Sequence, residues 1–256
     1  RFPDEVINAH PAVAAIVNAY QAARDHNTGN FAGALDRFNL AWEAALETGQ
    51  TLTAVVAAVN AGGTYVGLND HEAALEWLQR GLELARANGW AVTLGPCLRQ
   101  MGEVMRAMGR LEIAQSLLDE ALVAYQPLRN SRNFTLVLTA LGDLAQRRGD
   151  YAKAFEHFQQ QTELSLRLGQ TDAAMEGQLG IAYALLQLGK DAEAGESALV
   201  ALSLARNQGA VIQEIGALRL LARIHTQRGA DAEATHCLEQ ALATARTVEG
   251  YLIPSE

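Results

Sequence analysis

Arginine, carboxylate and tyrosine side chains recur along the chain at spacings of three or four residues, and they are the residues best able to bind a charged group. Arg219 and Arg223 are four residues apart, and Arg99, Glu103 and Arg106 follow the same spacing. On a helix this spacing places the members of each set on one face. Guanidinium groups that share a face suit the carboxylates of a peptide or of a partner helix. The alternative is ordinary salt bridging between neighbouring helices.

Histidine, cysteine, serine and glycine residues do not occur at the spacings that metal sites, phosphate-binding loops or catalytic nucleophiles require. The six histidines form no His-Glu-x-x-His motif, and no Cys-x-x-Cys is present, so the spacing of metal ligands is missing. The glycine-rich segment 62–67 lacks the Gly-Lys-Ser/Thr of a phosphate loop, and Ser197 lacks the second glycine of a nucleophile elbow. The carboxylates of Glu43, Glu72 and Glu83 are typical of a solvated surface. We therefore predict that the chain is not an enzyme and has no catalytic residue, no metal site and no cofactor.

The isolated histidines and cysteines have structural interpretations. His71 and His157 are expected on exposed helix surfaces, and His225 at a buried packing position. Cys97 and Cys237 lie far apart in the sequence, in distant repeats, so we expect two buried, unpaired thiols in a reducing compartment. Together with the lack of a signal-peptide pattern, this predicts a cytoplasmic protein.

Charge and hydropathy exclude two classes of partner. The net charge is −9, and only two of the 20 basic residues are lysines. A protein that follows the phosphates of a nucleic acid needs a basic stripe, so no nucleic acid is expected to bind here. No run of about 18 apolar residues suggests a membrane span, so no membrane partner is expected.

The elements that must position these residues form a repeat with a period of about 40, a length typical of stacked helical units. A turn residue is followed five positions later by alanine in six successive copies. The turn residues are Gly29, Asn69, Gly109, Gly149, Gly189 and Gly229, and the alanines are Ala34, Ala74, Ala114, Ala154, Ala194 and Ala234. A fixed period of this length indicates one supersecondary unit whose copies stack on one another.

Each repeat is predicted to hold two antiparallel helices. In the fourth repeat, apolar residues from Phe134 to Leu144 follow a helical spacing, Gly149-Asp150 breaks the helix, and a second helix opens at Tyr151. A second break recurs half a repeat later. Small residues also recur inside the first helix and are expected to face the alanine of the second helix; they are Ala22, Gly62, Gly102, Gly142, Ala182 and Ala222.

These features resemble the tetratricopeptide repeat, which has a small residue in its first helix and an alanine early in its second. The segment 149–155 is very close to the turn of that family, and Phe38 and Phe158 fall where it has a large residue. The resemblance implies an all-α, right-handed superhelical solenoid of about six helix-turn-helix repeats.

The repeat length indicates which variety of the tetratricopeptide repeat the chain resembles. The period is longer than the family's commonest one, about 34 residues, and is similar to the long-helix variety of bacterial signalling and transcriptional regulators. HEAT and armadillo repeats share the length but not the Gly-Asp-Tyr turn. The repeats are expected at 11–50, 51–90, 91–130, 131–170, 171–210 and 211–250, with the start of a truncated further helix at 251–256.

The same resemblance places the first helices along a concave groove that holds peptides. The groove is then expected to be small and apolar at Ala23, Val59, Gly63 and Val66 and charged from the third repeat onward. The residues expected to bind a partner there are Arg99, Glu103, Arg106, Asp143, Arg147, Tyr183, Arg219 and Arg223. Pairing of Arg106 with Asp143 or Glu103 remains the structural alternative.

Two functional interpretations follow. The first is a non-catalytic module that binds a protein or peptide, such as its own output domain, as the sensory or scaffolding region of a larger bacterial regulatory protein. The second is an oligomerisation domain, a homodimer that pairs output domains such as a diguanylate cyclase or a DNA-binding domain. The start at Arg1 and the interrupted pattern after Tyr251 suggest a piece of a longer protein.

Overall fold

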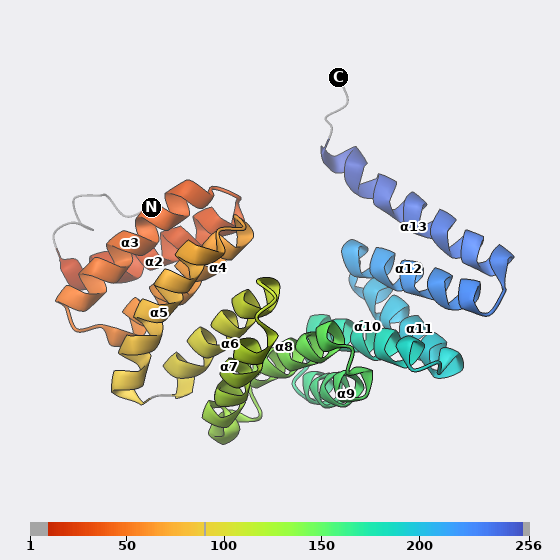
Figure 1. Ribbon diagram of the computed structural model, residues 1–256. Helices are drawn as coiled ribbons and strands as arrows, with labels where there is room; N and C mark the ends of the chain where they lie inside the picture. The colour runs from red at the N-terminus through yellow and green to blue at the C-terminus, as the bar shows by residue number, and fades with distance from the viewer. Residues whose placement is uncertain (1–9, 90, 253–256) are drawn as a thin grey trace. The chain divides into compact units, whose positions relative to one another are not determined.

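The fold is helical throughout the part of the chain that the computed structural model describes, residues 10–89 and 91–252 (Figure 1). Side chains are described for these residues except 91 and 248–252. The helices are α2 (Pro11–Asn27), α3 (Phe31–Glu47), α4 (Thr51–Gly67), α5 (His71–Asn88), α6 (Ala91–Ala107), α7 (Leu111–Ala124), the 3-10 turn η1 (Gln126–Leu128), α8 (Arg132–Arg148), α9 (Tyr151–Arg167), α10 (Thr171–Gln187), α11 (Asp191–Gln208), α12 (Val211–Gln227) and α13 (Asp231–Leu252). The predicted all-α class is confirmed.

The chain divides into two compact units, Arg1–Arg129 (unit 1) and Asn130–Glu256 (unit 2). Within each unit, consecutive helices pack on each other as hairpins. The first helix of a repeat also packs on the first helix of the next one, as α2 does on α4, α4 on α6, α8 on α10 and α10 on α12. Each unit is therefore a stack of helical repeats. That the repeats form one continuous right-handed array stays a prediction.

The turns inside the hairpins form as predicted. Gly149 adopts φ +78°, in the left-handed region that closes a helix, and its N–H donates to the carbonyl of Gln146. The N–H of Asp150 donates to the carbonyl of Ala145 at 2.9 Å. The Asp150 carboxylate then accepts a hydrogen bond from the backbone N–H of Lys153 and so caps α9. One dipeptide therefore ends one helix and begins the next.

The same conformation recurs at the other predicted turns. Positive φ angles occur at Gly29, Asn69, Gly109, Gly189 and Gly229, and also at the second break, at Gly49, Gly89, Gly169 and Gly209. Asn69 is the only non-glycine residue with positive φ among the described residues. Its short polar side chain tolerates this conformation better than most others do.

The glycines of the first helices lie closest to a larger residue than the predicted alanine, although a Cβ atom on Gly102 would also lie 3.4 Å from the carbonyl oxygen of Ala114. A Cβ atom on Gly142 would lie 2.7 Å from the ring of Phe158, and one on Gly62 would lie 2.7 Å from Leu78. The expected neighbours were Ala154 and Ala74, which are fully buried one helical turn earlier. The hollow left by each glycine is instead filled by the large side chain that follows the alanine by four residues.

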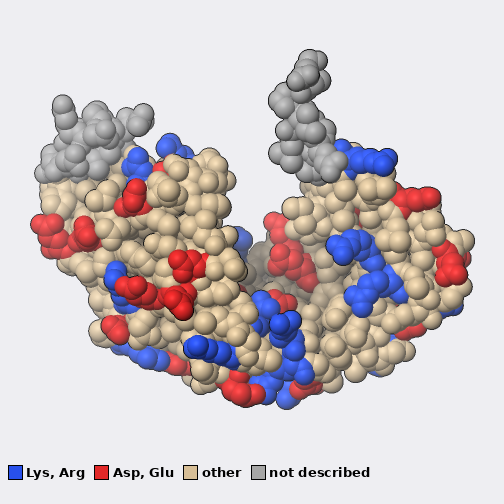
Figure 2. All heavy atoms as spheres, turned by 45° about the horizontal axis from the view of Figure 1, so that its top comes forward, with Lys and Arg blue, Asp and Glu red and all other residues tan. Residues whose placement is uncertain are grey.

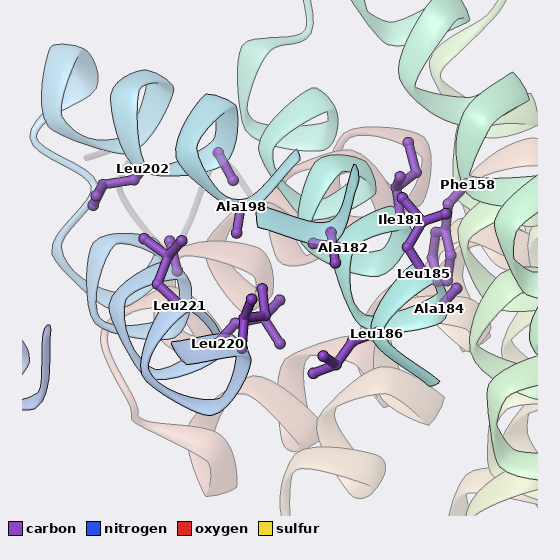
Figure 3. Packing of buried hydrophobic residues seen from close by; sticks show 14 of the residues in the cluster. Phe158, Ile181, Ala182, Ala184, Leu185, Leu186, Ala198, Leu202, Leu220 and Leu221 are labelled. Carbon is purple, nitrogen blue, oxygen red and sulfur yellow. The ribbon is translucent and has the colours of Figure 1, made fainter. Parts of the chain in front are cut away.

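The interior of unit 2 is aliphatic, as its composition predicts. Leucines of α10 and α12 pack against alanines of α10 and α11, with Phe158 of α9 at one end of the cluster (Figure 3). Leu218 and Leu144 are at most 1% exposed. Burial of one such side chain stabilises the fold by about 1.5–3 kcal/mol. Packing of apolar helix faces therefore contributes to holding the hairpins of this unit together.

The interior of unit 1 contains two of the three tryptophans. Trp77 is buried and packs edge-on against Trp42 with 6.0 Å between ring centroids. Trp90 lies outside the described residues.

A buried polar cluster joins α9 to α10, and no pattern in the sequence predicted it. Gln161 is fully buried and donates to the carbonyl of Ala173 at 2.7 Å and to the hydroxyl of Ser165 at 3.1 Å. Thr162 donates to Gln161 Oε1. A Cβ atom on Gly177 would overlap both Gln161 and Thr162, so the cluster explains this helical glycine.

The last helix differs from the expected pattern. α13 continues through residues 249–252, where a break and a new helix at Tyr251 were predicted. Residues 253–256, the rest of that predicted helix, lie outside the described part of the chain.

Candidate partner-binding site in unit 2

A cavity with a volume of about 920 Å³ lies in unit 2. Its walls come mainly from the first helices of three successive repeats, α8, α10 and α12. Because α10 packs against both α8 and α12, residues from three successive repeats line one cavity. The charged and aromatic residues that line the cavity include Asp143, Glu176, Tyr183, Arg219 and Arg223.

α12 supplies the basic wall of the cavity. Arg219 and Arg223 are one helical turn apart and exposed. The Arg223 guanidinium lies over the ring of Tyr183, with its Cζ atom 5.3 Å from the ring centroid. Neither arginine forms an ion pair with another described residue. Their donors thus remain available to an anionic group.

Tyr183 is held in place from both sides. Its ring makes an edge contact with Tyr151 of α9, with 6.3 Å between centroids, while Arg223 covers its face. The side chain of Gln146 is also held by the protein, since its amide donates a hydrogen bond to the carbonyl of Gly180 at 3.2 Å. The cavity therefore has a partly ordered polar wall before any ligand binds.

α8 and α10 supply the acidic wall, with Asp143 and Glu176. Glu176 is exposed, but the protein atoms around it desolvate its carboxylate and raise its pKa, the nearby charge of Asp172 raises it further, and Arg132 opposes the shift. Glu176 was not among the residues predicted to bind a partner. The repeat register could have indicated it, because Glu176 occupies in the fifth repeat the position that Gly216 occupies in the sixth, and both line this cavity.

Positive and negative side chains thus occupy different helices of this site. Figure 2 shows that basic side chains gather in groups on the face that it draws. Between the charged walls of the cavity lie apolar side chains, Leu179, Leu220, Leu238 and the edge of Phe158. The arrangement can hold an apolar group with charges of opposite sign at its two ends.

The structure brings together four of the eight residues predicted to bind a partner. Asp143, Tyr183, Arg219 and Arg223 line the cavity, whereas Arg147 is exposed on α8 outside its lining. The remaining three, Arg99, Glu103 and Arg106, belong to α6 of unit 1. Whether any of the eight binds a partner stays a prediction.

In α6 one ion pair forms, and it lies within the helix and not between neighbouring helices. Arg99 donates to Glu103 at 2.6 Å along the same helix, and the Arg99 side chain is 16% exposed. The Nε atom of Arg106 is buried without a partner among the described residues. Glu103 is therefore paired with Arg99 and not, as considered from the sequence, with Arg106.

A smaller cavity of about 210 Å³ lies in unit 1 between α2, α4 and α6. Ala23 and Gly63 line it, as predicted for an apolar groove, but four polar side chains do so as well: His26, Asn27, Asn60 and Gln100. The apolar description of this face was therefore incomplete, because it did not count the polar residues between the predicted positions.

The hydrogen bonds of His26 fix its tautomer. Thr64 donates its single hydroxyl proton to the carbonyl of Asn60 at 2.8 Å and lies 3.0 Å from His26 Nδ1. Thr64 can only accept from the imidazole, so Nδ1 carries the proton of that bond.

The other histidines and the cysteines depart in part from the expectations. His71 and His157 are half-buried and not exposed, and His225 is also half-buried, where a core position was expected. Cys97 is buried, and burial raises the pKa of its thiol to about 12. Cys237 is only partly buried, and desolvation raises its pKa.

Neither a metal site nor a membrane span is found in the described part of the chain. No group of three or more His, Cys, Asp or Glu side chains in these ranges is arranged to hold a metal ion. Among the described helices none is both long and apolar enough to cross a membrane.

Comparison with known proteins gives the family. Family models described as tetratricopeptide repeat match residues 56–88, 96–167 and 215–252, which together make up more than half of the chain. No curated protein sequence matches the chain.

Solved structures that resemble this one share little sequence with it. The apo form of RapI is 12% identical with a TM-score of 0.71, covering 92% of this chain and 84% of RapI. Aspartyl phosphate phosphatase F from Bacillus subtilis is 14% identical with a TM-score of 0.70, covering 95% of this chain and 62% of the phosphatase. A signal transduction ATPase with numerous domains and a tetratricopeptide repeat sensor, from Pyrococcus horikoshii, is 16% identical with a TM-score of 0.73, covering 93% of this chain and 37% of that protein. At such identities the likeness concerns the fold. The repeat period, the helical hairpins and the matching family models lead to one conclusion: the chain belongs to the tetratricopeptide repeat family.

Proposed function

We propose that this chain is a non-catalytic module that binds a protein or peptide partner, the sensory or scaffolding region of a larger bacterial regulatory protein. Tetratricopeptide repeats in general form protein-interaction scaffolds. The observation that carries the proposal for this chain is the cavity of unit 2, in which Arg219 and Arg223 face open space without ion-pair partners among the described residues. The regulatory setting is supported by the phosphatase and the repeat sensor among the similar folds.

In this proposal, Arg219 and Arg223 bind carboxylates of the partner and Tyr183 offers a flat surface beside them. The partner touches three first helices at once, because the cavity is built from α8, α10 and α12. Binding therefore favours one packing of these helices over others. A ligand that prefers one arrangement shifts the population of the protein toward it, and this is the route by which the module would signal.

The test is a selection of displayed random peptides on the purified chain, followed by affinity measurements with the enriched peptides. The double variant Arg219→Ala/Arg223→Ala is expected to bind them at least about tenfold to hundredfold more weakly, because even one hydrogen bond to a charged group contributes a net of about 1.5–3 kcal/mol. The control is Arg167→Ala/Arg246→Ala, which removes two exposed arginines outside the cavity. Equal affinities of the two double variants would place the partner elsewhere.

A second candidate is an oligomerisation domain that pairs output domains, such as a diguanylate cyclase or a DNA-binding domain. The observation that favours it is an apolar edge on α13, where Leu238 and Leu242 are one turn apart and each 53% exposed. Light-scattering mass over a concentration series tests this candidate. A dimer that dissociates when Leu242 is replaced by lysine supports it, and a monomer at all concentrations contradicts it.

A further inference from the structure

Gly216 is a helical glycine that the packing of unit 2 does not explain. Glycine inside a helix costs about 0.5–1 kcal/mol relative to alanine, so each one needs a reason. Gly142 and Gly180 make room for the ring of Phe158, and Gly177 makes room for Gln161. A Cβ atom on Gly216 would meet only Leu179 Cδ1, at 3.7 Å, which is an ordinary contact.

What the missing side chain provides at Gly216 is space in the cavity. Gly216 belongs to the wall that α12 contributes, and a larger side chain there would project into the open volume. Gly195 of α11 also has open space around it, but it is not part of the lining of this cavity. The position of Gly216 therefore widens the site at one point on α12.

The surroundings of Gly216 specify what fits there. Residues 216, 219, 220 and 223 share one face of α12, because they are three, four and seven positions apart. Leu220 lies beside the opening and Leu179 faces it from α10. A group that enters over Gly216 thus meets aliphatic side chains, with the guanidinium of Arg219 next to them. This environment favours a bulky apolar side chain adjacent to a carboxylate.

The opposite wall specifies the other end of the ligand. Glu176 of α10 is exposed at the cavity wall, where the nearby charge of Asp172 disfavours its carboxylate and Arg132 compensates for only part of the effect. A cationic group of the ligand would stabilise that charge. Neighbouring helices are about 8–10 Å apart, and an extended peptide advances about 3.3 Å per residue. About three residues therefore separate a ligand carboxylate at α12 from a ligand cation at α10.

We propose that the cavity of unit 2 binds an extended peptide segment with a fixed order of groups. An acidic residue next to a bulky aliphatic or aromatic residue lies on α12, and a lysine or arginine about three positions away lies against Glu176. This inference rests on the proposed function, since it names the chemistry of the partner for the same site. The segregation of charge between α12 and the acidic helices sets the direction in which the peptide lies.

The experiment selects displayed random nonapeptides on the full chain and sequences the enriched pool. The pool is expected to contain Asp or Glu beside Leu, Ile, Phe or Tyr, with Lys or Arg about three positions away. Fluorescence anisotropy with an enriched peptide is then measured for Gly216→Leu, which fills the opening, and for Gly195→Leu, the matched change outside the cavity. Gly216→Leu is expected to weaken binding about tenfold or more, whereas Gly195→Leu leaves it unchanged.

A charge exchange provides an independent readout if Gly216→Leu proves unstable. Arg219→Glu is expected to lose binding of the selected peptide and to regain part of it when the acidic residue of the peptide is replaced by lysine. A pool without the acidic–apolar pair, an unaffected Gly216→Leu variant, or no recovery in the charge exchange overturns the inference but leaves the proposed function standing. A chain that enriches no peptide over an uncoated support overturns both.

Discussion

At the scale of single residues, arginines at equivalent positions of two repeats differ in whether the protein supplies an ion-pair partner. Arg99 and Arg219 occupy equivalent positions in the third and sixth repeats, each with a charged residue four positions on. In α6 that residue is Glu103, and the two side chains pair at 2.6 Å. In α12 it is Arg223, and like charges one turn apart repel by a few tenths of a kcal/mol. The isolated chain gains nothing from this repulsion, and an anionic ligand would relieve it.

Glu176 leads to a prediction about pH. Its pKa is raised in the folded protein, mainly by burial, so the charged form weakens the fold once the pH rises above the ordinary carboxyl pKa of about 4.3. Glu176→Gln removes that charge. We expect the variant to be slightly more stable than the original protein at neutral pH. The difference should shrink as the pH falls and vanish below the pKa of an unfolded glutamate.

Urea unfolding of both proteins between pH 3 and pH 8 measures this difference directly. A difference that grows toward acid pH would mean that a cation of the protein stabilises the Glu176 carboxylate more than burial destabilises it. The carboxylate on the acidic wall of the cavity would then already have a cationic partner within the protein and would have less need of one from a ligand.

At the scale of elements, Phe158 of α9 joins three helices. Its ring lies between Gly142 of α8 and Gly180 of α10, and Cβ atoms on these glycines would lie 2.7 Å and 2.6 Å from it. Gly142 borders the outer end of the ring and Gly180 the end nearer the backbone, so neither position has room for a methyl group while the ring stays in place. Close contact between these helices thus depends on glycine at both positions.

Gly142→Ala is therefore expected to destabilise the protein although alanine is the better helix former. Overpacking of a core costs about 1–3 kcal/mol, which exceeds the gain in helix propensity of about 0.5–1 kcal/mol. Gly216→Ala is the matched control, because the new methyl group has room, and it is expected to stabilise by about 0.5–1 kcal/mol. The midpoints of urea unfolding should shift in opposite directions. Equal gains in both variants would show that α9 can move away from α8.

Helices and turns could be predicted from the sequence because their causes are local and repeated. The backbone at Gly149 and at the equivalent turns is left-handed, a conformation that glycine adopts readily. Because the turn residue recurs in every repeat, each copy supports the same prediction. The cavity could be predicted only in part. Arg219 and Tyr183 followed from the register, and the same register could have indicated Glu176. The role of Gly216 depended on which side chains leave space, and spacing along the chain does not contain that information. The cluster around Gln161 was missed for the same reason, since its partners are a backbone carbonyl and two hydroxyls.

At the scale of the whole molecule, the division into two units has consequences for stability. In repeat proteins each repeat contacts mainly its neighbours, so stability is a sum of local terms and a defect acts locally. Leu78 of unit 1 and Leu218 of unit 2 are both fully or almost fully buried, at 0% and 1% exposure. The same substitution at the two positions therefore compares the units with one another.

Leu78→Ala and Leu218→Ala are each expected to cost about 2–5 kcal/mol in the unit that contains them. Native-state hydrogen exchange, read by peptide, is the measurement, because it reports the free energy of opening for each segment separately. Leu78→Ala should lower the protection of α4 and α5 and of the helices packed on them, and leave α10–α12 close to their original protection. Leu218→Ala should do the reverse. If either substitution lowers protection equally in both units, the chain unfolds as one cooperative body, and a partner bound to unit 2 would then stabilise unit 1 to the same extent.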